Sequence, residues 1–182
     1  ANIQTILGAF EYGTMTSDNL SFFTQRKRPQ WEIVDIKASI TEAAIDVQAI
    51  APSNPIDGLL ELPASELLTF GDANWLRMAV SNLLLNAIEH SPSSAGIAVK
   101  AKKLNQTIEI QVSDQGPGIV PGIEYKIFKP FYTTRPGATG LGLANVRMVM
   151  EKHGGGIRVG SHPEGGAAFT LILQALQRQK AA

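Results

Sequence analysis

Asn82 and Asn86 stand four residues apart in a stretch with the apolar spacing of a helix, so their side chains share one helix face. Glu89 and His90 extend that face by a further turn. A neutral amide oxygen can bind Mg²⁺ when phosphate groups supply the compensating negative charge. Two asparagines on a helix are by themselves more often a solvated surface, so a chemical role here depends on the segments that follow.

A second segment, Asp114-Gln-Gly116-Pro-Gly118-Ile119, places a carboxylate at the end of a predicted strand and directly before a turn. A carboxylate in this position can accept a hydrogen bond from the exocyclic amine of adenine, which favours adenine over guanine. Gly116 and Gly118 carry no side chains, so we expect the backbone to approach the base closely. Asp and Gly are also the commonest turn residues, and a simple turn is the alternative interpretation.

A third segment, Ile127-Phe-Lys129-Pro-Phe131-Tyr-Thr-Thr-Arg135, predicts a loop with two aromatic anchors, Phe128 and Phe131. Its two cations could bind a triphosphate. Arg135 offers a planar guanidinium with a fork of N–H donors, and Lys129 offers the point charge of an ammonium group. The residues alone do not decide which cation touches phosphate. A surface loop pinned by core phenylalanines is the alternative, and both interpretations can hold together.

The fourth segment, Thr139-Gly140-Leu141-Gly142-Leu143, opens a predicted helix. The free N–H groups and the positive dipole end of a helix N-terminus favour phosphate. Glycines at this point let the backbone wrap around phosphate oxygens.

In this order and at this spacing, the four segments resemble the catalytic, ATP-binding domain of bacterial two-component sensor histidine kinases, over roughly residues 30–176. The resemblance implies ATP as the nucleotide and Mg²⁺ as the metal, with Asn86 as the metal ligand and Asn82 supporting it. It implies a catalytic role for Asn82, Asn86, Lys129 and Arg135. It implies nucleotide binding by Asn86, Glu89, His90, Asp114, Gly116, Gly118, Ile119, Phe131, Thr139, Gly140, Leu141, Gly142 and Leu143.

Two positions depart from that family's pattern. Ala138 stands where a glycine is usual, which bears on the mobility of the loop as a lid. Ala167 stands near a place where the family often has Ser or Thr, which bears on a water contact beside Asp114.

In the same family the phosphoacceptor is a histidine followed by an acidic residue. His90, His153 and His162 have no such neighbour, so the resemblance implies an acceptor outside this chain and no autophosphorylation by this chain alone. The implied partners are the dimerisation and phosphoacceptor domain of the same kinase and a cognate response regulator. The full-length protein is expected to be a homodimer, with this part in the cytoplasm, whether or not the sensor is anchored in a membrane.

Three other functions remain open on the sequence. A related ATPase would use a glutamate in the place of Asn82 to activate water, and asparagine cannot take that proton. A non-catalytic module gated by ATP is favoured by Ala138 and Ala167. A serine kinase of the anti-sigma type is weaker, because such domains are usually shorter and lack the third segment.

The composition excludes several classes of function. Sixteen basic residues balance sixteen acidic ones among 182, so no overall charge attracts nucleic acid or an anionic membrane. There is no cysteine, which excludes disulfides and cysteine-ligated metals. No apolar run reaches the roughly 18 residues that a membrane-spanning helix needs, so direct membrane contact is not expected.

The elements that must position these residues follow from periodicity and turn residues. Apolar spacing predicts a helix from about Ile36 until Pro52 and Pro55 end it, with further helices over 72–90 and 142–153. Strands are expected over 58–62, 67–70, 97–103, 107–114, 156–161 and 167–174, and a long functional loop over 115–141.

The resemblance implies the Bergerat ATP-binding fold, an α/β two-layer sandwich with a mixed, mostly antiparallel sheet of about five strands and three helices on one face. Residues 1–28 predict a weak helix, which either packs on the main domain or is a dimerisation helix cut short. The resemblance implies that they are the end of the second helix of the dimerisation and phosphoacceptor hairpin, with its linker. We expect the ATP-binding domain over 29–176 and a disordered tail over 177–182.

Overall fold

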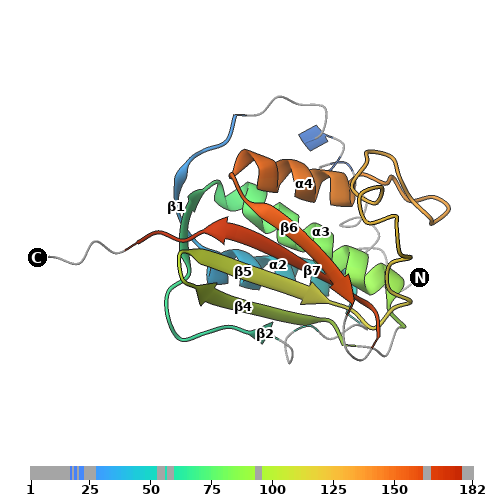
Figure 1. Cartoon of the computed structure of the whole chain (residues 1–182), viewed down its shortest axis with the longest axis horizontal. Coiled ribbons are helices and arrows are strands. Elements are labelled where there is room, and N and C mark those ends of the chain that lie inside the picture. The colour runs from blue at the N-terminus through green and yellow to red at the C-terminus, as the bar shows by residue number, and fades with distance from the viewer. Residues whose placement is uncertain are drawn as a thin grey trace, which may run out of the picture.

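The structure is a computed structural model that describes residues 28–52, 56, 60–92, 96–161 and 165–177, together with four helical residues upstream, Ser17, Asn19, Ser21 and Phe22. In this part of the chain, three helices cover one face of a five-stranded sheet (Figure 1). The helices are α2 (Ile36–Ile50), α3 (Ala73–His90) and α4 (Gly142–Lys152). None of the helices described is long and apolar enough to cross a membrane.

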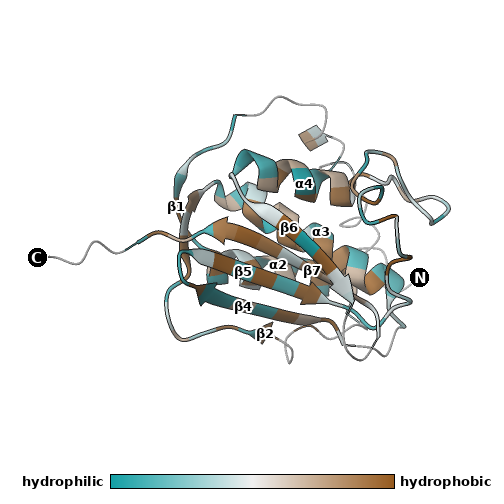
Figure 2. Cartoon of the chain, viewed as in Figure 1, coloured by the Kyte–Doolittle hydropathy of each residue, from teal (hydrophilic) through white to brown (hydrophobic). Residues whose placement is uncertain are grey.

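The five-stranded sheet has the order β2-β4-β5-β7-β6. The short β2 (Leu60–Glu61) pairs in parallel with β4 (Ala98–Leu104), and the remaining neighbours are antiparallel. They are β5 (Thr107–Ser113), β7 (Ala167–Gln174) and β6 (Gly156–Ser161). Figure 2 shows hydrophobic residues concentrated along β5 and β7, and most residues of these two strands are buried. The predicted two-layer architecture is therefore confirmed.

A second, two-stranded sheet was not predicted. β1 (Glu32–Asp35) pairs antiparallel with β3 (Leu68–Gly71), so the strand expected over 67–70 exists but lies outside the main sheet. Only Val34 of β1 is buried, while Ile33 is largely exposed. A four-residue strand with a single core contact leaves almost no periodic signal in the sequence.

The helix that carries the two asparagines begins and ends as its sequence predicts. The Asp72 carboxylate caps α3 by accepting a hydrogen bond from the Trp75 N–H at 2.9 Å. Its apolar stripe is buried against the sheet and the other helices: Leu76, Ala79, Val80, Leu83, Leu84 and Ala87. Ser91, followed by Pro92, ends the helix.

His153 ties the end of α4 to the beginning of α3. Its Nε2 accepts a hydrogen bond from the Asp72 backbone N–H at 3.0 Å, and its Nδ1 donates to the Val149 carbonyl at 2.7 Å. A carbonyl can only accept and an amide N–H can only donate, so the proton sits on Nδ1. The ring packs beside Trp31 and Trp75. The role is structural, as the sequence indicates, and it fixes α4 relative to α3.

The outer face of the sheet carries one nearly buried acid. Glu109 on β5 is only 8% exposed, although alternation along the strand predicts a solvated position. Arg158 on β6 donates to it at 3.0 Å, and Lys102 on β4 lies 3.4 Å away. The hydrogen bond from Arg158 holds the pKa of the Glu109 carboxyl below its ordinary value, burial works in the opposite direction, and Lys102 lowers it further.

Because the pKa of Glu109 is lower in the folded than in the unfolded chain, the ionised carboxylate stabilises the fold at neutral pH. This stabilisation is lost as the pH falls through the folded-state pKa. Glu109→Gln should therefore lower the free energy of unfolding at pH 7, and the difference from wild type should shrink in acid. Urea unfolding between neutral and acid pH measures this. Glu61→Gln is the control, since Glu61 forms an exposed ion pair with Lys100, and equal pH profiles for the two variants would contradict the prediction.

Candidate functional site

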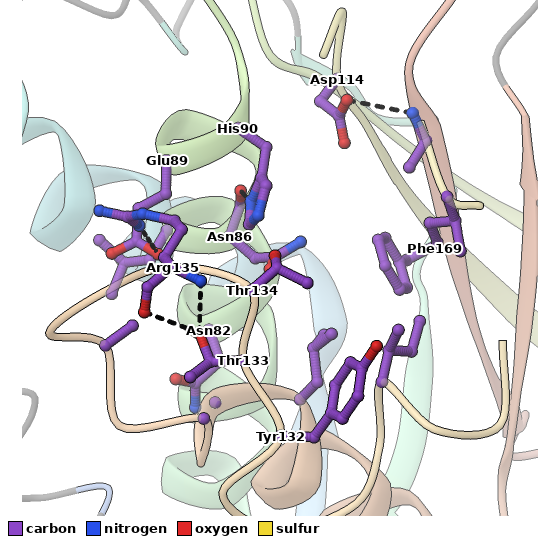
Figure 3. Close-up of a pocket in the computed structure, with 18 of the residues that line it drawn as sticks. Asn82, Asn86, Glu89, His90, Asp114, Tyr132, Thr133, Thr134, Arg135 and Phe169 are labelled. Atoms are coloured by element: carbon purple, nitrogen blue, oxygen red, sulfur yellow. Dashed lines mark hydrogen bonds and ion pairs between the residues drawn. The ribbon is translucent and has the colours of Figure 1, made fainter. Parts of the chain in front are cut away.

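The four predicted segments meet around one cavity of about 430 Å³ between α3, the loop after β5, the beginning of α4 and the beginning of β7 (Figure 3). The predicted site residues that line it come from all four segments: Asn82, Asn86, Glu89, His90, Asp114, Gly118, Ile119, Arg135, Thr139, Gly140, Gly142 and Leu143. Gly116, Lys129, Phe131 and Leu141 lie outside this lining, and their contact with a nucleotide stays a prediction.

Asp114 is bound on one side and open on the other. Its Oδ1 accepts hydrogen bonds from the backbone N–H groups of Gly116 at 2.8 Å and Ala167 at 3.0 Å. No donor among the described residues reaches Oδ2, and the residue lines the cavity while being only 3% exposed. Figure 3 shows the Asp114 carboxylate at one end of the group of labelled side chains, with its hydrogen bond to the backbone of β7. The arrangement fixes the carboxylate and leaves one acceptor for a donor within the cavity.

Two glycines make this placement of Asp114 possible, each by close contact with backbone. A Cβ at Gly116 would lie 2.5 Å from the carbonyl oxygen of His90, at the end of α3. The absence of a side chain at Gly116 therefore serves packing against α3, and its expected role in approach to the base stays a prediction. Gly166 has φ +89°, and a Cβ there would overlap the carbonyl oxygen of Asp114. Sequence reasoning missed Gly166, although the pair Gly165-Gly166 before a strand is a turn signal.

The two asparagines of α3 differ in their surroundings. Asn82 is buried, and its carboxamide forms a reciprocal pair of hydrogen bonds with Asn19, at 2.8 and 2.9 Å. The carboxamide of Asn86 lines the cavity and makes no hydrogen bond with the described residues. Its backbone carbonyl accepts from His90 Nδ1 at 2.8 Å, which leaves His90 Nε2 as the other ring nitrogen at the cavity. Asn86 is therefore the asparagine that can offer its side-chain oxygen to a metal.

The loop is held against α3 by an ion pair between Arg135 and Glu89, both of which line the cavity. Thr133 Oγ1 accepts from the Arg135 N–H at 3.0 Å and orders the backbone beside it. Successive turns over residues 120–138 form the rest of the loop, as the sequence predicts. Lys129 instead lies 5.6 Å from the centroid of the Tyr125 ring, outside the cavity lining.

Of the two predicted aromatic anchors of the loop, Phe128 packs on the core and Phe131 does not. Phe128 packs edge-on against Phe169, with 6.4 Å between ring centroids. Phe131 is 66% exposed, so the expectation that it pins the loop to the core is wrong. Phe131 has φ +65°, and its N–H donates to the Gly140 carbonyl at 3.0 Å, so its backbone is fixed by a turn contact with the fourth segment.

The beginning of α4 forms the opposite end of the cavity from Asp114. No side chain in the described part of the chain caps this helix, so its first-turn N–H groups have no side-chain acceptor there. Gly140 has φ +65° and a Cβ there would lie 2.6 Å from the backbone of Phe131, so the loop packs directly on it. A Cβ on Gly142 would lie 3.2 Å from Asn82 Oδ1. This end suits an anion.

Both departures from the family pattern lie at the cavity. Ala138 lines it, and its N–H lies 3.4 Å from the Arg135 carbonyl that accepts from it. Ala167 contacts Asp114 through its backbone N–H, so the carboxylate keeps two donors without a hydroxyl at this position. The beginning of β7 therefore holds Asp114 whatever side chain it carries there.

Comparison with known proteins agrees with this geometry. The family model for histidine kinase-, DNA gyrase B- and HSP90-like ATPases matches residues 71–177. The chain is 33% identical over 152 residues to the signal transduction histidine-protein kinase AtoS of Escherichia coli, covering 83% of this chain and 25% of AtoS. The mycobacterial sensor histidine kinase MprB superposes with a TM-score of 0.72 at 30% identity, over 80% of this chain and 98% of that structure.

A further structure, histidine kinase ThkA in complex with the response regulator protein TrrA, shares the fold with a TM-score of 0.74 at 22% identity. It covers 92% of this chain and 48% of the ThkA chain. The chain therefore belongs to the histidine kinase-, DNA gyrase B- and HSP90-like ATPase family, as an ATP-binding catalytic domain of the sensor histidine kinase type. It spans only about a quarter of the length of AtoS.

The contact between Gly166 and Asp114 gives a stability test with a matched control. Gly165 and Gly166 both have positive φ, but a Cβ at Gly165 meets no atom within 4 Å, whereas one at Gly166 overlaps Asp114. Gly165→Ala should cost about 1–2 kcal/mol of unfolding free energy from backbone strain alone. Gly166→Ala should cost roughly 1–3 kcal/mol more, because the turn must shift. Equal losses in urea unfolding would show that the contact does not constrain the turn.

Proposed function

We propose that this chain binds Mg-ATP in the cavity and presents the γ-phosphoryl group to a histidine on a separate dimerisation segment. The observation that carries the proposal is the Asp114 carboxylate at one end of the cavity, with donors from the described residues on Oδ1 alone. The beginning of α4, which has no side-chain cap in the described part of the chain, lies at the opposite end. The first suits the amine of adenine and the second suits phosphate. The nucleotide would therefore lie with its base at Asp114 and its phosphates towards α4.

Asn86 is proposed to hold Mg²⁺, with Asn82 in support. A carboxamide oxygen is a hard ligand of the kind Mg²⁺ accepts, and phosphate oxygens and waters would complete the shell. Asn86 fits this role because its carboxamide reaches the cavity without a hydrogen bond from the described residues. Bound there, the ion would neutralise negative charge on the phosphates.

The proposed reaction is phosphoryl transfer. A nitrogen of the acceptor imidazole forms a bond to the γ-phosphorus, the bond from that phosphorus to the bridging oxygen breaks, and ADP leaves with the electron pair. Such a reaction depends mostly on positioning and charge stabilisation. Arg135 is the cation at the cavity and Lys129 lies on the same loop, so both are proposed to meet the phosphates after the loop moves. Asn82 cannot act as a general base, so hydrolysis by water should be slow.

The proposed partners follow from the kind of kinase this domain belongs to. The acceptor histidine would come from the dimerisation domain of the same protein, which we propose is a homodimer when complete. A cognate response regulator would then receive the phosphoryl group, by analogy with the complex of ThkA and TrrA. The site would face the cytoplasm.

Asp114→Asn tests the base contact. If Oδ1 keeps its two backbone donors, the amide nitrogen takes the place of Oδ2 and meets the adenine amine donor to donor. Losing one hydrogen bond to a charged group costs about 1.5–3 kcal/mol, so ATP affinity should fall roughly 10- to 100-fold. GTP, whose base carries an acceptor at the same position, should lose much less. Calorimetry with both nucleotides measures this, and an unchanged preference for ATP would show that Asp114 is not the selector.

Asn86→Ala tests the metal site. The wild-type chain should bind a non-hydrolysable ATP analogue more tightly with Mg²⁺ than with EDTA, and the variant should lose most of that difference. Asp114→Asn is the matched control, because it should weaken binding while keeping the dependence on Mg²⁺. An Asn86→Ala variant with the full wild-type dependence on Mg²⁺ would refute the assignment.

A further inference from the structure

Two upstream residues contact the same helix that carries the metal-site asparagines. Phe22 is buried, with its ring edge-on to Trp75 at 4.8 Å between centroids. Asn19 and Phe22 are both helical and stand three residues apart, a spacing that places side chains on one helix face. Asn19 contacts Asn82 and lines the cavity. The contacts of Asn19 and Phe22 favour the interpretation that this segment packs on the main domain.

Asn19 satisfies two buried amides at once. Its Oδ1 accepts from Asn82 Nδ2 and from Asn145 Nδ2, both at 2.9 Å, and its backbone carbonyl accepts from Asn145 Nδ2 at 3.0 Å. Asn145 lies on α4 and is fully buried. A buried carboxamide without partners costs free energy. Among the described residues, the acceptors for Asn145 Nδ2 are the two oxygens of Asn19, so Asn19 is a specific neighbour of α4.

The position of these contacts is what matters for function. They lie where α3 and α4 meet, beside Gly142, at the end of the cavity that suits an anion. The side-chain oxygen of Asn19 receives two N–H donors there, as a phosphate oxygen would. A triphosphate and Asn19 would need the same donors.

We propose that the upstream stretch containing Asn19 and Phe22 is an internal competitor of ATP, which occupies the phosphate end of the cavity until the nucleotide displaces it. The proposal rests on the proposed function, because it assumes that phosphates bind at this end. Linkage makes the coupling reciprocal: the docked stretch lowers the affinity for nucleotide, and bound nucleotide releases the stretch. Nucleotide binding would thus change whether the segment that precedes the domain is docked on it or released.

The test compares the whole 182-residue chain with three variants: Asn19→Ala, Phe22→Ala and Ser17→Ala. Asn19→Ala removes the competing oxygen, and Phe22→Ala removes the anchor on Trp75 without touching the cavity lining. Each should bind a non-hydrolysable ATP analogue with Mg²⁺ about tenfold more tightly, since one or two net hydrogen bonds or a buried ring no longer have to be displaced. Ser17 is exposed, and Ser17→Ala should match wild type.

A second readout follows the stretch itself. In the wild-type chain, backbone amide exchange over residues 17–22 should become faster when the analogue and Mg²⁺ are added. If Asn19→Ala and Phe22→Ala bound the analogue no more tightly than wild type, the proposal of competition would be wrong. It would also be wrong if amide exchange over residues 17–22 slowed or stayed unchanged on binding. If none of the four chains bound the nucleotide, the proposed function itself would fail, which is a different outcome from four chains that bind it equally.

Discussion

The carboxylate of Asp114 is held by the backbone of two separate segments, and the rest of the site is arranged around that attachment. The hydrogen bond from Gly116 closes the turn that follows Asp114, and the one from Ala167 joins the end of β5 to β7, its neighbour in the sheet. Gly166 must lack a side chain because the Asp114 carbonyl lies against it. Because both donors to Oδ1 are backbone N–H groups, no mobile side chain has to be ordered to hold it. Oδ2 stays available to discriminate between bases.

The opposite end of the cavity depends on how α4 is set against α3. His153 joins the end of α4 to Asp72 at the beginning of α3, and a Cβ on Gly71 would lie 2.7 Å from that ring. At the other end of α4, Gly142 lies close to Asn82. With both ends of α4 placed against one helix, the anion-binding N–H groups and the α3 asparagines keep a fixed relation, which is what positioning a reacting phosphoryl group requires.

Much of the fold and of the candidate site was predictable from the sequence, because it depends on local sequence patterns. The helical spacing of Leu76 to Ala87 predicts α3, and the order of the four segments predicts the cavity and the placement of Asn86 and Asp114 in it. The rest depends on contacts that no local pattern contains. Asn19 meets Asn82 across 63 residues and Asn145 across 126, and each is an unremarkable polar residue in its own segment.

Other differences from the sequence prediction have local physical causes. Phe131 is exposed and its backbone has a positive φ, which aromatic residues rarely adopt and which its sequence does not indicate. β1 has only one buried side chain and gave no periodic signal. Glu109 on β5 forms ion pairs with Lys102 on β4, on one side of it in the sheet, and with Arg158 on β6, on the other side. Alternation along β5 alone cannot indicate these contacts.

The most direct test of the account is a crystal structure of the chain with Mg²⁺ and a non-hydrolysable ATP analogue. The account predicts the adenine amine within hydrogen-bonding distance of Asp114 Oδ2, the phosphates at the first turn of α4, and the metal on the side chain of Asn86. A nucleotide bound in the reverse orientation, or outside the cavity, would contradict it.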